Sequence, residues 1–163
     1  MVKYEVIEEL GNNIEIRKYP DMIAIFTQCK NRYSAFSALS GYIFGNNEKK
    51  TKIKMTAPVL LMYGEMNPVM SFILPEDFTM ENTPAPLSGR VSVGQVDSKV
   101  LLVSSSRGNL NRKRREEMEV LLEEKIKELA LKRKGNFFQM SYNPPWIPSF
   151  MKKNEIAIVL DYA

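Results

Sequence analysis

The chain has 163 residues, 44% hydrophobic and 26% charged, a composition typical of one soluble globular domain with its own core. Its net charge of +4 is too small to indicate a nucleic-acid partner by itself. It contains no histidine and one cysteine, Cys29, which excludes Ser-His-Asp and Cys-His catalytic relays, histidine-ligated haem or zinc, thiolate metal clusters and an internal disulfide.

The N-terminal residues and the cysteine count predict a cytoplasmic protein. The opening residues MVKYEVIEEL carry acids where a signal peptide needs an apolar core. No run of about 20 apolar residues is present, so no membrane span is expected. A single cysteine fits a reducing compartment.

The first part of the chain is predicted to form a hairpin, a buried strand and a helix. Residues 4–10 and 13–19 flank a Gly-Asn turn, and in the second segment Ile14 and Ile16 alternate with Glu15 and Arg17, which predicts one buried and one wet face. Residues 22–28 run apolar almost continuously, as in a strand covered on both faces. From about Arg32 to Phe44 the apolar period becomes helical, and Gly45 is suited to a helix end.

The middle of the chain is predicted to form two strands and a loop. Residues 52–63 have alternating apolar positions, with Pro58 marking an edge or a bulge because proline cannot donate to a ladder. Residues 67–75 would pair with them across a turn at 63–67. Residues 76–89 contain prolines and predict a loop.

The remainder repeats this plan. Residues 90–96 and 99–106 predict a hairpin over Asp97-Ser98, and a helix is expected from about Asn109 to Lys134. Two strands, 136–142 and 154–162, would follow, joined by a loop rich in proline.

The order of elements therefore predicts one α+β domain over residues 1–163. We expect a pseudo-twofold duplicated unit of strand-strand-helix-strand-strand, with internal halves of about 1–76 and 88–163. Together they would form a curved antiparallel β-barrel of about nine strands with two flanking helices.

The basic run Arg112 to Arg115 suggests nucleic-acid binding, but the same helix continues with six glutamates. Oppositely charged residues four positions apart pair along a helix surface. The run therefore predicts a solvated helix carrying ion pairs, with no nucleic acid as partner.

Four motifs resemble the SOUL haem-binding protein family, over about Tyr4 to Asp161. They are FSALSGYIFGNN at 36–47, KMTAPV at 54–59, MSFILP at 70–75, and YNPPW followed by KKNEIAIVL at 142–160. The resemblance implies a pseudo-symmetric β-barrel with two helices that binds haem or free porphyrin noncovalently in a mainly apolar surface cleft. It implies a tetrapyrrole carrier or buffer rather than an enzyme, with no catalytic residue and no protein metal site.

Two other functions remain open. The architecture is similar to effector-binding domains of the gyrase-inhibitor type, which hold flat hydrophobic or cationic molecules. The other open function is that of a histidine-free enzyme acting on a tetrapyrrole, which would have to show turnover.

The resemblance implies that the cleft lies along the first helix and includes the proline loop. The predicted pocket residues are Tyr33, Phe36, Leu39, Ser40, Ile43, Phe44, Trp146 and Phe150. Three of them, Phe36, Leu39 and Ile43, would equally well pack on the sheet, and the Trp146 loop would equally well plug the end of the barrel. The nearby basic residues expected to hold the propionates are Arg32, Lys52, Lys54 and Lys152.

Without histidine, binding would rest on flat apolar contacts and charge-assisted hydrogen bonds. Such contacts can reach micromolar affinity, about −8 kcal/mol, without a bond to iron. Cys29 and Met55 are the candidates if iron is coordinated, although a buried strand sulfur usually fills core space. Tuned redox chemistry is not expected.

Overall fold

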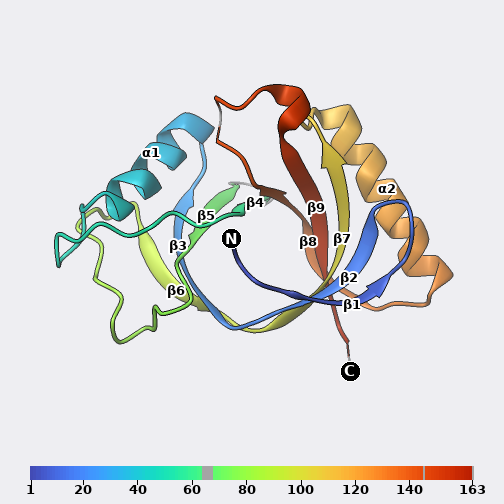
Figure 1. The fold of residues 1–163 in the computed structure, drawn as a ribbon, viewed down its shortest axis with the longest axis horizontal. Helices are drawn as coiled ribbons and strands as arrows, with labels where there is room; N and C mark the ends of the chain where they lie inside the picture. The colour runs from blue at the N-terminus through green and yellow to red at the C-terminus, as the bar shows by residue number, and fades with distance from the viewer. Residues whose placement is uncertain (64–67, 145, 163) are drawn as a thin grey trace. The chain divides into compact units, whose positions relative to one another are not determined.

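The structure is a computed structural model and describes residues 1–63, 68–144 and 146–162 (Figure 1). In these residues it contains nine strands, two α-helices and one short 3-10 helix. Their bounds are β1 Glu5–Glu9, β2 Ile14–Tyr19, β3 Met22–Gln28, α1 Arg32–Ile43, β4 Val59–Met62, β5 Val69–Ile73, β6 Ser92–Val96, β7 Lys99–Arg107, α2 Arg112–Glu128, β8 Arg133–Ser141, the 3-10 turn Ser149–Met151 and β9 Lys153–Leu160. The α+β class and the antiparallel strand pairing are as predicted.

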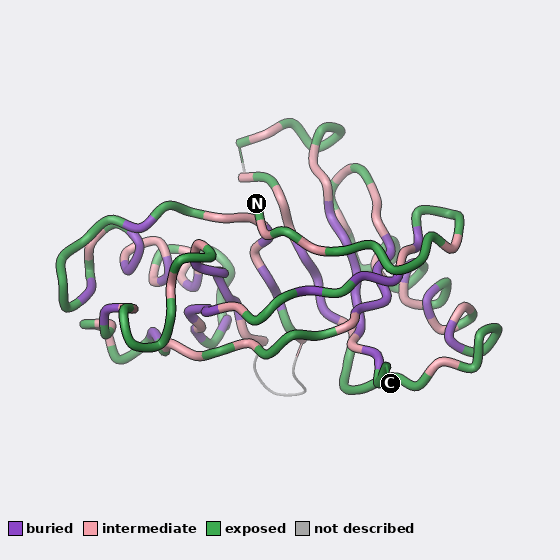
Figure 2. Tube along the Cα trace, turned by 60° about the horizontal axis from the view of Figure 1, so that its bottom comes forward, coloured by how far each residue is buried: buried purple, intermediate pink, exposed green. Residues whose placement is uncertain are grey.

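The chain forms two compact units. Unit 1 contains Met1–Val2 and Asp21–Asp97, and unit 2 contains Lys3–Pro20 and the residues from Ser98 onward. In the described part of the chain, no helix is long and apolar enough to cross a bilayer. Figure 2 shows that buried positions follow the strands and the helix sides that pack on them.

Unit 1 is a sheet in the order β4-β5-β3-β6 with α1 packed on one face. Its core joins Ile25 of β3 and Phe72 of β5 to Leu39 and Tyr42 of the helix. The Tyr42 hydroxyl donates a hydrogen bond of 2.5 Å to the Pro84 carbonyl, which ties the 76–89 segment to the helix.

Unit 2 is a sheet in the order β8-β9-β7-β2-β1 with α2 on one face. One side of α2 contributes Met118, Leu122 and Ile126 to the core. Its exposed side carries ion pairs, including Arg112–Glu116 at 3.0 Å, as the charge pattern predicts.

The two units share one topology. In each, a central strand leads into the helix, a hairpin follows, and the strand order is β4-β5-β3-β6 around α1 or β8-β9-β7-β2 around α2. β1 adds a fifth strand to unit 2. The repeated unit is thus present in the topology, whereas the division at about 1–76 and 88–163 stays a prediction.

The hairpin predicted over Asp97-Ser98 is wrong. β6 pairs with β3, whereas β7 pairs with β2 and β9. The break between the two strands falls at Asp97-Ser98 as expected, but it is not a hairpin turn, because a local pattern does not reveal which strand will become the partner.

The strand expected over 52–63 begins only at Val59, directly after Pro58. Because proline has no N–H for the ladder, it ends the pairing there. The predicted turn at 63–67 falls largely outside the described residues.

The second helix is shorter than expected. It ends at Glu128 with Leu129 as its C-cap, after which Ala130 takes a φ of +51° and the Leu131 N–H donates to the Ile126 carbonyl. This is a Schellman ending with alanine in place of glycine. Gly135, expected to close the helix, lies within β8.

Candidate functional site

The first helix is held at both ends by local hydrogen bonds. The Asn31 side chain caps it by accepting a hydrogen bond from the Ser34 N–H at 3.1 Å. At the other end Phe44 is the C-cap and Gly45 has a φ of +120°, a conformation that favours glycine. The apolar period and the glycine therefore predicted both ends of this helix correctly.

The outward side of α1 has large aromatic side chains at its ends and small residues between them. Tyr33 is 86% exposed and Phe44 is 69% exposed. At about 100° per residue, Ser37, Ser40 and Gly41 fall on the same side between them. We call these five residues the α1 outer face. The Cα atoms of the two aromatic residues are separated by about 16 Å along the helix axis, from the rise of 1.5 Å per residue.

Two lysines lie beside the C-terminal end of this face. The buried Asn47 side chain donates to the Tyr42 and Thr51 carbonyls at 2.9 and 2.8 Å, which fixes the loop after the helix. The Ile53 N–H then donates to the Ile43 carbonyl at 2.8 Å. Ile53 is buried, so the exposed side chains of Lys52 and Lys54 project from the other side of this extended segment.

The other residues predicted along α1 have different surroundings. Leu39 and Ile43 belong to the core, as their alternative interpretation allowed. Phe36 is half-buried and contacts Phe72 edge to face, with ring centroids 5.3 Å apart. Arg32 is exposed at the start of the helix, at the end opposite Lys52 and Lys54.

The proline loop of unit 2 is anchored at its base and exposes its aromatic side chains. Asn143 Oδ1 accepts a hydrogen bond of 2.7 Å from the Lys153 N–H, and the Lys152 carbonyl accepts one of 2.9 Å from the Gly108 N–H. Trp146 is 78% exposed and Phe150 is 77% exposed. Neither ring plugs its own unit. Lys152 is half-buried, and Pro145 lies outside the described residues.

A buried charge network lies at the base of this loop. Glu155 is fully buried and accepts two hydrogen bonds from Arg17, at 2.9 and 2.6 Å, one of 2.5 Å from the Ser105 hydroxyl, and one from the Tyr142 hydroxyl. The Arg17 guanidinium also lies 4.2 Å from the ring centroid of Tyr4. The wet face predicted for the second strand is therefore wrong at Arg17, because the partner that permits its burial is 138 residues away.

The network shifts the pKa of each member. Burial alone would raise the pKa of Glu155, but the hydrogen bonds and charge of Arg17 outweigh it and lower that pKa below 4.5. Burial opposes the charge of Arg17, yet the contacts with Glu155 raise its pKa overall. Burial, followed by the charge of Glu155, raises the pKa of Tyr142. At neutral pH the pair is ionised and the tyrosine is protonated.

The sulfur atoms proposed as iron ligands differ in accessibility. Cys29 is buried in the core of unit 1, which suits the core-filling interpretation. Met55 is partly exposed, close in sequence to Lys54. Among the described residues, no group of three or more His, Cys, Asp or Glu side chains is placed to hold a metal ion.

A sequence profile described as "SOUL heme-binding protein" matches residues 1–159. This match covers nearly the whole chain. The protein belongs to the SOUL haem-binding family. No curated protein sequence matches it.

Solved structures similar to this SOUL-family protein have little sequence identity with it. An uncharacterized conserved protein from Listeria innocua aligns with a TM-score of 0.70 at 9% identity, over 92% of this chain and 93% of that one. A hydrolase from Listeria innocua gives 0.67 at 8% identity, over 94% of both chains. The C-terminal domain of EcmrR gives 0.65 at 14% identity, over 94% of this chain and 100% of that one. These similarities show the fold alone.

The residues missed by sequence reasoning are Ser37, Gly41, Arg17 and Glu155. The first two could have been found, since they follow Tyr33 at intervals of four residues. The buried pair could not, because nothing near Arg17 in the sequence indicates its distant partner.

Proposed function

We propose that this protein binds haem or free porphyrin noncovalently on the α1 outer face and acts as a tetrapyrrole carrier or buffer. The observation that carries the proposal is the pair of exposed aromatic residues, Tyr33 and Phe44, separated by small residues and bordered by Lys52 and Lys54. Exposed aromatic rings give up few existing contacts when they cover a flat apolar ligand, so the contact with the ligand favours binding. Membership of the SOUL family supplies the class of ligand.

The energetics suit reversible binding. Each large side chain that becomes fully buried contributes roughly 1.5–3 kcal/mol. Phe44 and Tyr33 together with two lysine–propionate contacts would supply part of the about −8 kcal/mol that micromolar affinity requires, and the other contacts of the porphyrin ring would supply the rest. Ser37, Ser40 and Gly41 allow a flat ring to approach the helix backbone.

Iron coordination has no part in this proposal. The chain contains no histidine, and Cys29 is buried within the core. Haem and iron-free porphyrin are therefore expected to bind with similar affinity. We propose no catalytic residue, and a cytoplasmic location that agrees with a single reduced cysteine.

The proline loop is the second element that the family resemblance implicates. We retain Trp146 and Phe150 as proposed ligand contacts and Arg32 and Lys152 as proposed propionate partners. The proline residues support this role, because a ring whose backbone is already restricted loses little entropy on binding. Leu39 and Ile43 would support the face from the core, and Phe36 would border it.

Binding of hydrophobic cations is the alternative function, and it needs an acidic residue available to the ligand. Glu155 is buried, but Arg17 already neutralises it through two hydrogen bonds. A cationic ligand would have to displace an internal guanidinium. This observation favours the tetrapyrrole.

The test compares haemin with iron-free protoporphyrin IX, each titrated by absorbance against the protein and against Phe44→Ala and Tyr33→Ala. Val120→Ala is the matched control, because Val120 is an exposed apolar residue on α2. We expect one-to-one saturation, similar for both ligands, weakened by about tenfold in Phe44→Ala and unchanged in the control. Trp146→Ala decides whether the proline loop contributes.

Absence of saturation, or equal weakening in the control, would contradict the proposed face. Haemin binding far tighter than protoporphyrin would show that iron coordination matters. Tighter binding of a hydrophobic cation than of either tetrapyrrole would favour the alternative function.

A further inference from the structure

A cavity of about 640 Å³ lies in unit 1, at the start of α1 and the end of β3. Its lining includes Phe26, Thr27, Lys30, Ser34, Val69 and Arg90. This volume falls within the range of small-molecule sites. The α1 outer face, by contrast, contributes none of its five residues to this lining.

The cavity exists because two neighbouring strands end at different points. The pairing of β3 with β5 continues to Gln28 opposite Val69, whereas its pairing with β6 ends at Phe26 opposite Ser92. The chain before β6 instead turns through residues 88–91, where the Val91 N–H donates to the Ser88 carbonyl at 3.3 Å. The end of β3 therefore has a neighbouring strand on one side only.

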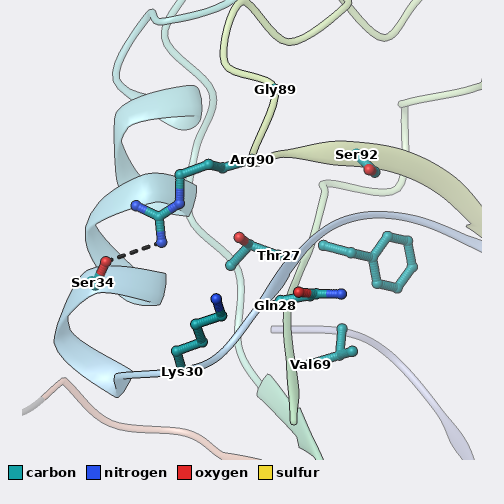
Figure 3. A pocket seen from close by; sticks show the side chains of 9 residues that line it. Thr27, Gln28, Lys30, Ser34, Val69, Gly89, Arg90 and Ser92 are labelled. Carbon is teal, nitrogen blue, oxygen red and sulfur yellow. Dashed lines mark hydrogen bonds between the residues drawn. The ribbon is translucent and has the colours of Figure 1, made fainter. Parts of the chain in front are cut away.

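The charged side chains of the lining are both basic. Arg90 Nη2 donates a hydrogen bond of 3.0 Å to the Ser34 hydroxyl, which holds the guanidinium against the first turn of α1 (Figure 3). Figure 3 shows the Lys30 side chain extending into the same space. Among the described residues, neither cation forms an ion pair. Two positive charges near a helix N-terminus favour an anion.

A threonine side chain of the lining is available to a ligand. Thr27 is only 4% exposed, and among the described residues no hydrogen bond is made by its side chain. In Figure 3 its side chain lies on the same side of β3 as the guanidinium of Arg90. Because Thr27 lines the cavity, its hydroxyl can donate a hydrogen bond to a polar ligand there. This observation is independent of the two charges and suits a polar ligand.

We propose that this cavity binds a small organic anion, a carboxylate or a phosphate monoester with an apolar portion. Its charged group would lie between Arg90 and Lys30 and accept hydrogen bonds from the hydroxyls of Thr27 and Ser34. Its apolar portion would extend past the open edge of β3 toward Phe26 and Val69, which lie on the other face of the sheet. The ligand is separate from the tetrapyrrole, and the proposal does not depend on that function.

The experiment titrates phenyl phosphate and 3-phenylpropionate into the isotopically labelled protein and follows its backbone amide resonances. Benzyl alcohol provides the apolar ring without a charge, and inorganic phosphate provides the charge without a ring. We expect saturable shifts at residues 27–34 and 88–92 with both organic anions, weaker binding of phosphate, and none of benzyl alcohol. The stronger of the two organic anions identifies the charged group preferred.

Variants separate a built site from general electrostatic attraction. Arg90→Gln and Lys30→Gln should each weaken binding at least about fivefold, since a charge-assisted hydrogen bond is lost. Lys127→Gln on α2 removes the same charge from an exposed position of unit 2 and should change nothing. Thr27→Val preserves the shape and removes the hydroxyl, and should weaken binding while leaving the amide spectrum otherwise native.

Three results would overturn the proposal. They are shifts that never saturate, equal weakening by Lys127→Gln, and binding of benzyl alcohol as tight as that of phenyl phosphate. The titration is repeated with protoporphyrin IX present at saturation. Loss of phenyl phosphate binding there would show that the tetrapyrrole occupies the cavity and that no separate ligand site exists.

Discussion

The two units have the same topology but differ in the kind of side chain on the sheet face that points away from the helix. Ser71 of unit 1 pairs with a residue two positions before the end of β3, and Glu155 of unit 2 pairs with a residue two positions before the end of β7. The positions are therefore equivalent. In unit 1 that face carries the Phe26 ring, which packs so closely on Gly94 that a Cβ there would lie 3.0 Å from it. In unit 2 it carries an ion pair.

This difference shows that the fold fixes the helix side of each sheet more strictly than the other side. The next residues, Phe72 and Ile156, are both apolar and both belong to the core beneath their helix. Only the opposite face varies between an aromatic ring and a charge network. Functional divergence between the two units is thus possible without a change of topology.

Removing one charge of the Arg17–Glu155 network in unit 2 should have the largest effect on stability. Arg17→Met leaves Glu155 buried without its counter-ion, and we expect a loss of about 3–5 kcal/mol in the free energy of unfolding. Chemical denaturation followed by circular dichroism measures it. Adding Glu155→Leu to that variant should restore most of the loss, because two apolar side chains replace the pair. A single variant as stable as the parent would show that the network does not hold unit 2 together.

The second largest expected effect is the pH dependence of the free energy of unfolding, which the charge network of unit 2 should cause. The folded-state pKa of Glu155 lies below its ordinary value of 4.5, so its contribution is present above pH 4.5 and is lost as the pH falls through the folded pKa. We expect the stability difference between the parent and the Arg17→Met/Glu155→Leu double variant to shrink on acidification in that range. Denaturation series at several pH values measure it. A difference independent of pH would contradict the assigned ionisation of Glu155.

The outer sides of the two helices provide a third comparison, because α1 presents aromatic and small residues where α2 presents ion pairs. No atom lies within 4 Å of a Cβ built at Gly41, so a side chain can begin there without a clash, and Gly41→Leu should stabilise the helix by about 0.5–1 kcal/mol. The same side chain would occupy the middle of the α1 outer face and lower porphyrin affinity by about tenfold.

Thermal unfolding and the porphyrin titration measure the two effects of Gly41→Leu, which have opposite signs. Ser37→Ala, which barely changes the size of the same face, is the control and should preserve affinity. A stabilised Gly41→Leu variant with unchanged porphyrin affinity would show that the ligand does not bind to this face.

The sequence predicted the parts of the molecule that depend on local patterns. The bounds of β3 and of α1 follow from apolar periodicity and from Gly45, and the exposed Tyr33 and Phe44 follow from their place at the edge of the helical stripe. These features need only neighbouring residues, which explains their success.

The features it did not predict depend on distant partners. Arg17 can be buried because it donates hydrogen bonds to Glu155, which lies 138 residues away in the sequence. Arg90 is held by a hydrogen bond to Ser34, 56 residues away. The partner of β6 was missed for the same reason, since it is β3 and not the adjacent β7. The plug suggested for Trp146 depended on the loop's direction, which its prolines stiffen but do not specify.

The smallest expected effect concerns Ser71, the position equivalent to Glu155. Its hydroxyl is buried and, among the described residues, has no hydrogen-bond partner, so its desolvation cost is not offset. Glu155 in unit 2 is also desolvated, but its hydrogen bonds with Arg17 offset that cost. Ser71→Ala removes that hydroxyl without enlarging the side chain and should raise the free energy of unfolding by up to about 1 kcal/mol. In unit 2, Ser105→Ala removes a hydroxyl of the same kind that donates to Glu155, and it should lower the free energy of unfolding. Parallel denaturation curves measure both, and a loss of stability in Ser71→Ala would show that the hydroxyl has a partner, such as a buried water, that unit 1 requires.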